Sequence, residues 1–320
     1  QPDLSAGSFR NTALVREMKS KLGSNEGIWV ITSKPNRYGS FNVEAKDSED
    51  WGQAKIMRVE LPKFRTGFLG QALAFSYFAW HVYFLTKRQN FDLVYASSSR
   101  MMTAALGALI AKKNRCHLQL DIRDNFVESL EAVVPKFLLN IFTAIFNRLE
   151  RWTLTKASAI NLVSEGFNNY YSAKYPEIPL SFHPNGIDCE FIQQPLKRTK
   201  RNKFLRKTVL YAGNIGDGQG LHKIIPNLAK LFEERLDFIV IGDGGKKGWL
   251  DQELKTLKVT NVKLIAPVKR ETLMEYYDAC DVLFLHLNAH SAFENVLPSK
   301  IFEYAAKLLK LCDDNVRLPL

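Results

Sequence analysis

Short runs of hydrophobic residues alternate along the chain with longer stretches in which hydrophobic residues recur at helical spacing. In the first half the short runs predict strands at Ile28–Thr32, Ile56–Leu61, Leu93–Ala96, Leu118–Ile122 and Ala159–Val163. The longer stretches predict helices at Leu14–Leu22, Thr66–Thr86, Met101–Lys112 and Lys136–Ala157. Strands and helices that alternate at this spacing indicate parallel βαβ units in a doubly wound sheet.

The second half repeats this alternation after a change in composition. Residues 193–207 read QQPLKRTKRNKFLRK, a basic and polar segment typical of a solvated linker. Beyond it we predict strands at Thr208–Ala212, Phe238–Ile241, Val262–Ile265 and Val282–Leu285, and helices at His222–Glu234, Trp249–Leu257 and Arg270–Cys280. We therefore expect an α/β fold with two Rossmann-like domains, residues 1–188 and 208–320, which are joined by a linker at 189–207 and face each other across a cleft.

The composition is that of a globular protein with an excess of positive charge. Of the 320 residues, 46% are hydrophobic and 24% are charged, which excludes a disordered or collagen-like chain. Lysine and arginine number 44 against 33 aspartates and glutamates, so the formal net charge is +11. This excess favours anionic partners: nucleic acid, an acidic membrane surface or phosphorylated ligands.

Two features bear on the cellular compartment. The four cysteines form no CxxC pair, so we interpret them as reduced thiols of a cytosolic protein: Cys116, Cys189, Cys280 and Cys312. The chain opens on polar residues that do not resemble a signal peptide, and it does not begin with Met. We therefore expect it to lack a few leading residues.

The stretch from Thr66 to Thr86 is long enough to cross a bilayer and contains no charged residue. However, Gln71, Ser76 and His81 interrupt it, and its aromatic residues are spread along it rather than gathered at two belts. We predict a buried or interfacial helix rather than a membrane span.

Two glycine-rich segments follow predicted strands of the second half, Gly213–Gly220 (GNIGDGQG) and Gly242–Gly245 (GDGG). Glycines at such positions let backbone N–H groups approach a phosphate, and the helix that follows adds the positive end of its dipole. The spacing matches neither a Walker loop nor the strict dinucleotide motif, and a plain strand-to-helix turn explains the first segment equally well.

A third candidate is the sequence NVLPSKIFEY, residues 295–304. Pro298 and Ser299 suit the start of a helix, whose first amides can hold an anion, and Lys300 adds a cation. Glu303 lies one turn later and is able to accept hydrogen bonds from ribose hydroxyls, although an acidic residue in a first turn also favours the helix dipole by itself.

Taken in order, these motifs resemble the retaining GT-B glycosyltransferases of family four, in particular bacterial members that build O-antigen, capsule and lipopolysaccharide. The resemblance runs from GNIGDGQGL and IGDGGKK to LPSKIFEY in the second half. In the first half it includes VYASSS at 94–99, LDIRDNF at 120–126, NLVSEGF at 161–167 and HPNGIDCEF at 183–191.

The resemblance implies a role for each matching position. The residues that would bind a nucleotide-sugar donor are Gly7, Gly213, Asn214, Gly216, Gly242, Gly244, Val268, Lys269, Asn295, Leu297, Pro298, Ser299, Lys300 and Glu303. Those placed in catalysis are Arg123, Asp124, Glu294 and Lys300, with Arg123 and Asp124 on the acceptor side. The nucleotide-sugar, usually a UDP-sugar, is a substrate, and neither a cofactor nor a metal is expected.

The sequence departs from the family at several of these positions. Glu294 and Glu303 have eight residues between them where seven are usual, and Asn214 and Gln219 stand where many members carry Arg and Lys. Arg123 stands where many members have His. After IFEYAA the chain lacks the usual continuation, so we expect the second domain to be incomplete.

We therefore interpret the chain as a glycosyltransferase that moves a sugar from a UDP-sugar to a lipid-linked or polysaccharide acceptor, bound peripherally to the cytoplasmic face of the inner membrane. An anionic membrane surface is the expected partner of its basic residues Lys63, Arg65, Lys136, Arg148 and Arg151. A GT-B nucleotide-sugar epimerase is the alternative enzyme. A basic module that binds membranes or nucleic acid without catalysis is the alternative of another class, and we expect no nucleic-acid partner because the basic run at 197–207 carries a single aromatic residue.

Overall fold

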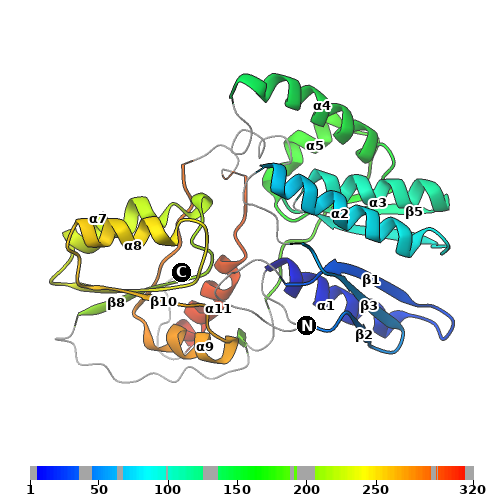
Figure 1. Ribbon diagram of the computed structural model, residues 1–320. Helices are drawn as coiled ribbons and strands as arrows, with labels where there is room; N and C mark the ends of the chain where they lie inside the picture. Colours follow the sequence, from blue (N-terminus) through cyan, green and yellow to red (C-terminus); the bar gives the residue numbers. More distant parts are fainter. Residues whose placement is uncertain are drawn as a thin grey trace. The chain divides into compact units, whose positions relative to one another are not determined.

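The computed structural model describes residues 6–35, 45–62, 68–98, 100–124, 136–187, 191–192, 206–289, 293 and 295–313. The chain forms two compact units (Figure 1), which are described separately. The first unit comprises residues 1–37, 43–185 and 294–297, and the second comprises residues 38–42, 186–293 and 298–320. Both are built from parallel strands and helices, so the predicted α/β class is confirmed.

The first unit begins with a helix and a small mixed sheet. Helix α1 (Ala6–Lys21) leads to β1 (Ile28–Ser33), which pairs in parallel with β3 (Ala54–Val59). On the other edge of β3 lies β2 (Ser48–Asp50), which is antiparallel to it. The sequence did not predict β2, because it is a three-residue polar strand that hydrophobic patterning does not detect.

A second sheet of the first unit contains β4 (Leu93–Ser98), β5 (His117–Ile122), β6 (Ala159–Leu162) and β7 (Leu180–Phe182), all parallel and in chain order. The connecting helices are α2 (Phe68–Thr86), α3 (Met101–Asn114), α4 (Lys136–Leu154), the short 3-10 helix η2 (Glu165–Phe167) and α5 (Asn168–Lys174). Helix α3 contacts both α2 and α4, so the three helices form one layer.

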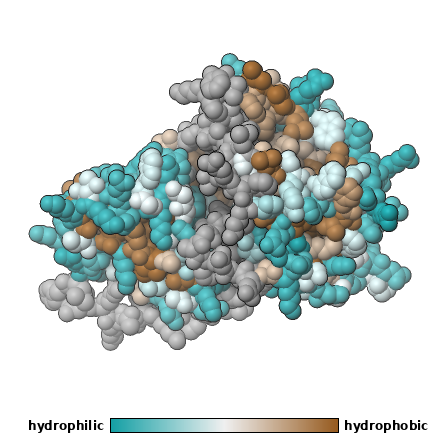
Figure 2. Space-filling model, viewed as in Figure 1, coloured by the Kyte–Doolittle hydropathy of each residue, from teal (hydrophilic) through white to brown (hydrophobic). Residues whose placement is uncertain are grey.

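The outer faces of α2 and α4 carry large hydrophobic side chains. Trp80 on α2 is 64% exposed and Ile141 on α4 is 58% exposed, and Figure 2 shows hydrophobic residues gathered over both helices. Among the described residues, no helix combines the length and the hydropathy that crossing a membrane requires.

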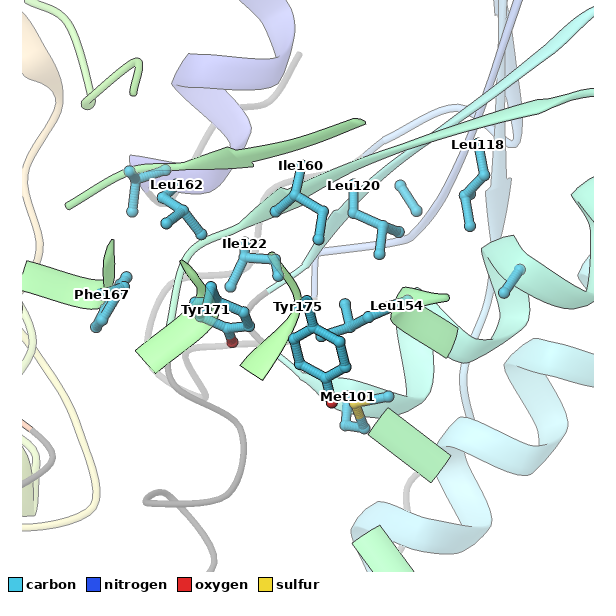
Figure 3. Close-up of a cluster of buried hydrophobic side chains, with 14 of the residues drawn as sticks. Met101, Leu118, Leu120, Ile122, Leu154, Ile160, Leu162, Phe167, Tyr171 and Tyr175 are labelled. Carbon is cyan, nitrogen blue, oxygen red and sulfur yellow. The ribbon is translucent and has the colours of Figure 1, made fainter. Parts of the chain in front are cut away.

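The core of the first unit lies between the second sheet and the helices that follow its strands (Figure 3). Leu118, Leu120 and Ile122 alternate along β5 and face Leu154 of α4 and Tyr171 of α5. Because side chains alternate along a strand, the intervening Asp121 points to the opposite face of the sheet. Its partner there comes from α1.

The second unit has one parallel sheet in the order β10 (Val262–Ile265), β9 (Leu236–Ile241), β8 (Lys207–Ala212) and β11 (Val282–Leu283). Its helices are η3 (Asp217–Gln219), α7 (Leu221–Leu231), α8 (Lys247–Thr256), α9 (Arg270–Ala279) and α11 (Lys300–Asp313). Helices α7 and α8 pack on one face of the sheet, whereas α9 and α11 pack on the other. The first strand, β8, lies between the second and the fourth, and such a sheet binds ligands where the strand order reverses.

Candidate functional site

The two glycine-rich segments meet at the carboxyl edge of the second unit's sheet. The Gly213 N–H donates to the carbonyl of Ile241 at 2.8 Å, and Gly242 N–H donates to the carbonyl of Ile265 at 2.9 Å. Both glycines have positive φ angles, +148° and +151°, and a Cβ on Gly242 would lie 1.8 Å from the Gly213 carbonyl oxygen. These strand ends therefore require glycine, and the sequence placed them correctly after β8 and β9.

The loop between β8 and α7 is closed by its own polar side chains. The Gln219 Oε1 accepts hydrogen bonds from Asn214 Nδ2 at 2.8 Å and from the Gly216 N–H at 3.3 Å. The two glycine-rich segments are also bonded to each other, because the Ile215 N–H of the first donates to the Asp243 carbonyl of the second at 2.8 Å. Asn214 and Gln219 thus shape the loop in this chain, at positions where the resembling family often carries cations.

A cation nevertheless lies at this loop, supplied by the first residue of α11. The Lys300 Nζ is 3.3 Å from the Tyr211 hydroxyl oxygen and 4.8 Å from the centroid of its ring. A Cβ on Gly213 would lie 2.1 Å from the same Nζ, which shows how closely the ammonium approaches the loop. The end of β8, the glycine-rich loop and the start of α11 together surround one positive charge.

The start of α11 adds the positive end of a helix dipole near that charge. Pro298 and Ser299 precede the helix, and their carbonyls accept the N–H groups of Ile301 and Phe302 at 3.1 and 3.2 Å. Because these two N–H groups are already bonded, the start of α11 favours an anion through its dipole and through Lys300.

Glu303 is an ordered, half-buried carboxylate one turn after Lys300. Its Oε2 accepts a hydrogen bond from the Tyr277 hydroxyl at 2.9 Å. Burial, and secondarily the charge of Glu303, raises the pKa of Tyr277 well above its ordinary value, so this tyrosine remains a donor. A carboxylate has about four acceptor positions, and the bond from Tyr277 occupies one of them.

The helix that carries Lys300 and Glu303 is anchored on α9. Lys307 of α11 forms an ion pair with Asp278 of α9 at 2.5 Å, and both side chains are largely buried. Val268 packs partly against the adjoining core, and Lys269 precedes α9, where its carbonyl accepts the Leu273 N–H at 2.9 Å. Val268 and Lys269 thus follow the carboxyl end of β10, on the same edge as the glycine-rich loops.

Other predicted donor residues belong to the first unit. Asn295 and Leu297 group with it, and the Ser164 hydroxyl donates to the Asn295 carbonyl at 2.5 Å. A Cβ on Gly166 would lie 2.7 Å from the same carbonyl oxygen, so the backbones approach closely there. Gly7 lies in the first turn of α1, and Glu294 lies outside the described residues.

A buried polar cluster at the carboxyl end of β5 was not predicted. The fully buried Asp121 accepts hydrogen bonds from Arg10 of α1 at 2.9 and 3.1 Å, from Ser97 at 2.8 Å and from Asn161 at 2.6 Å. Burial, followed by the charge of Asp121, raises the pKa of Tyr95 above its ordinary value. The sequence signal was the acidic Asp121 between Leu120 and Ile122 in a predicted strand.

The predicted acceptor residues lie directly beyond this cluster. Arg123 and Asp124 follow the carboxyl end of β5 and are both half-buried. The Arg10–Asp121 pair therefore ties the start of α1 to the strand that leads into them.

The described residues contain no group of three or more His, Cys, Asp or Glu side chains arranged to hold a metal ion. His286 instead contacts the glycine-rich loop, with its Nδ1 2.8 Å from the Gln219 carbonyl oxygen. His290, which follows it at a spacing of four, lies outside the described residues.

Comparison with known proteins finds a family match within the second half of the chain. Residues 193–306 match the family model of the glycosyl transferases group 1. Over 159 residues the chain is 31% identical to WcaI of Escherichia coli (strain K12), whose name describes a colanic acid biosynthesis glycosyl transferase. The match covers 48% of this chain and 36% of WcaI, so it spans about a third of that relative.

Solved structures show the fold of the whole chain. WaaG, described as a glycosyltransferase involved in lipopolysaccharide biosynthesis, aligns with a TM-score of 0.65 and 13% identity over 95% of this chain and 76% of WaaG. The sucrose-phosphate synthase of Thermosynechococcus elongatus aligns with a TM-score of 0.62 and 10% identity, over 96% of this chain and 84% of the synthase. Anabaena HepE, solved with UDP-glucose, aligns with a TM-score of 0.54 and 16% identity, over 79% of this chain and 65% of HepE. The protein has the fold of these GT-B glycosyltransferases, and its residues 193–306 match the family model of the glycosyl transferases group 1.

Proposed function

We propose that this protein is a retaining glycosyltransferase, which moves a sugar from a UDP-sugar to a lipid-linked or polysaccharide acceptor in bacterial surface polysaccharide synthesis. The observation that carries the proposal is the ammonium of Lys300 at the glycine-rich loop, with the start of a helix beside it. The names of WcaI and WaaG, and the UDP-glucose in the HepE structure, support the same class of reaction.

In this proposal the residues of the second unit bind the donor. The backbone of Gly213, Gly216 and the start of α11 faces the diphosphate, while Glu303 accepts hydrogen bonds from the ribose. Lys300 and the aimed amides stabilise the negative charge that grows on the leaving diphosphate. Because the protein itself supplies this charge, the proposed reaction needs no metal or other cofactor.

The remaining positions complete the proposed site. Gly242, Gly244, Val268 and Lys269 line the nucleotide, and Asn214 shapes the diphosphate loop. We propose that Glu294 and Asn295 serve the transferred sugar, and that the backbone from Leu297 to Lys300, which includes Pro298 and Ser299, faces the diphosphate. On the first unit, we propose that Gly7 contacts the donor and that Arg123 and Asp124 contact the acceptor.

A transfer assay tests this function and separates it from the alternative enzyme. The protein is incubated with a panel of UDP-sugars, with and without a lipid-linked glycan acceptor. We expect UDP to be released with the acceptor present and a glycosylated acceptor to form. Conversion of the donor to its epimer or to free sugar without an acceptor would favour the epimerase instead.

We further propose that the first unit binds the cytoplasmic face of the inner membrane. The layer of α2, α3 and α4 exposes Leu73, Trp80, Leu109, Ile141 and Ile145. Cations border it: the Lys87 Nζ lies 4.1 Å from the centroid of the Phe84 ring, and the Lys113 Nζ lies 5.9 Å from that of Tyr83. Hydrophobic side chains bordered by cations are the chemistry that binds anionic lipid.

Of the basic residues predicted for this surface, Arg148 and Arg151 lie on α4. Lys63 and Arg65 lie outside the described residues, as does the basic run at 197–205, and Lys136 is described only as the first residue of α4. Flotation with vesicles tests the surface. We expect binding to anionic vesicles at low salt that weakens as salt is raised, and equal binding to neutral vesicles would contradict an electrostatic contribution.

A further inference from the structure

A pocket of about 490 Å³ lies on the first unit, outside every position discussed so far. It is lined by Arg16, Lys19 and Ser20 from the last turns of α1 and by Trp51, which follows β2. Its volume is within the range of small-molecule sites.

The pocket lies at the amino ends of the strands, away from the edge predicted to receive the acceptor. The Ile28 N–H at the start of β1 donates to the Gln53 carbonyl at 2.7 Å, so the amino ends of β1 and β3 meet beside Trp51. At the other end of α1, Arg10 bonds Asp121 near the carboxyl end of β5. Arg10 and Lys19 are nine positions apart on α1, which corresponds to a rise of about 14 Å along the helix.

The ring of Trp51 is held in place by the turn that carries it. Its backbone N–H donates to the Ala54 carbonyl at 2.8 Å, and its indole N–H donates to Glu49 Oε2 at 3.2 Å. Gly52, at φ +77°, donates its N–H to Asp50 Oδ1 at 2.7 Å and completes the turn. The indole is therefore an ordered apolar surface before any ligand binds.

The other lining groups are positive or able to accept hydrogen bonds. Arg16 and Lys19 are three residues apart on α1 and so lie on one face of the helix. Across the described part of the chain, neither of them lies within ion-pair distance of a carboxylate. The Ser20 hydroxyl donates to the Glu17 carbonyl at 2.7 Å, and its oxygen remains able to accept.

We propose that this pocket binds a saccharide that carries a carboxylate or a phosphate. The C–H face of a sugar ring packs on the indole, a hydroxyl donates to Ser20, and the anionic group meets Arg16 and Lys19. A nucleotide offers a base for the indole and a phosphate for the same cations, so AMP serves as the competing probe in the test. The inference does not depend on the proposed transfer reaction.

Nuclear magnetic resonance of protein labelled with ¹⁵N-tryptophan tests the pocket directly. The indole signal of Trp51 is assigned by its loss in Trp51→Phe, and glucuronic acid, glucose 6-phosphate, glucose and inorganic phosphate are titrated separately. We expect a saturable shift of the Trp51 signal with the first two, at an affinity of about 1 mM. Glucose and phosphate each supply part of the contacts, so they should bind about tenfold more weakly.

Trp29 provides a matched control in the same sheet. It is 37% exposed and has the Lys55 Nζ 5.6 Å from its ring centroid, yet it does not line the pocket. We expect its signal to stay in place. Equal shifts of both tryptophans, or no saturable shift of Trp51, would overturn the proposal, as would tighter binding of AMP than of the two sugar acids.

Variants of Arg16 and Lys19 test whether these cations bind the anionic group of the sugar. The double variant Arg16→Gln/Lys19→Gln should abolish the shift with both anionic sugars, whereas Lys21→Gln, exposed on the same helix, should leave it unchanged. Retention of the shift in the double variant would overturn the proposal. Because the readout is Trp51 itself, this result stands whether or not the protein binds UDP-sugars.

Discussion

The ammonium of Lys300 lies 3.3 Å from the hydroxyl oxygen of Tyr211 and 4.8 Å from its ring centroid. Tyr211 is fully buried, and its hydroxyl donates to the Asn214 carbonyl at 2.7 Å. One phenol therefore contacts both the glycine-rich loop and the cation that we propose meets the diphosphate. This arrangement makes Tyr211 a positioning residue of the proposed donor site.

Tyr211→Phe should weaken UDP binding about threefold to tenfold and leave uridine binding unchanged, because it removes the hydroxyl but keeps the ring beside Lys300. Calorimetry measures both ligands. Tyr304→Phe is the matched control, since Tyr304 is a buried tyrosine of the same unit whose hydroxyl donates to the Phe284 carbonyl at 3.3 Å. Equal losses of UDP affinity in the two variants would show that Tyr211 has no specific role.

Gly242→Ala should destabilise the second unit by about 1–3 kcal/mol or more, because its φ of +151° disfavours a side chain and its Cβ would clash with the Gly213 carbonyl. Urea denaturation measures the change. Gly248→Ala is the control, because Gly248 lies within α8 and its Cβ would meet nothing within 4 Å. Alanine should stabilise that helix by about 0.5–1 kcal/mol.

Breaking the buried ion pair between Arg10 and Asp121 should lower the free energy of unfolding of the first unit. Arg10→Gln leaves the carboxylate of Asp121 without its cation, and such losses amount to about 3–5 kcal/mol. Denaturant unfolding of the first unit measures it. Lys34→Gln, which removes a cation from the neighbouring exposed pair with Glu60, should have no measurable effect, and similar losses in both variants would contradict the role given to burial.

The stability of the second unit should fall as the pH drops below about 6.5 because of His222. Burial, and secondarily the charge of Lys246, lowers the pKa of His222 below its ordinary value of 6.5. In this pH range the unfolded chain binds a proton that the folded chain resists, so stability rises with pH. Thermal unfolding between pH 5 and 7 should show this slope, and His222→Asn should reduce it. An unchanged slope in the variant would assign the dependence to other groups.

Local patterning predicted most elements of the fold because each is encoded within its own segment. The alternation of strands and helices fixed the α/β class, and glycine after β8 and β9 marked the edge of the sheet. It missed the short elements β2, α5 and β7. It also placed the start of α1 eight residues late, at Leu14 instead of Ala6, because the first turns of α1 lack a hydrophobic period.

Contacts between residues far apart in the sequence could not be predicted from local patterns. Arg10 and Asp121 are 111 positions apart, and Tyr211 and Lys300 are 89 apart, so no local spacing connects them. The partner of Glu303, Tyr277, was likewise hidden, although Glu303 itself was identified from its place after Pro298 and Ser299. Sequence motifs located the candidate positions, whereas the structure supplied the contacts that orient them.

Calorimetry tests whether Lys300 and Glu303 bind the nucleotide of the donor. UDP and uridine are each titrated into the wild-type protein, Lys300→Ala and Glu303→Ala. The wild type should bind UDP more tightly than uridine, because in the proposed site Lys300 and the start of α11 contact the diphosphate. Lys300→Ala should weaken UDP and spare uridine, whereas Glu303→Ala should weaken both by about tenfold or more, as expected for a charge-assisted hydrogen bond. A wild-type protein that does not bind UDP, or a Glu303→Ala variant that binds UDP normally, would contradict the account.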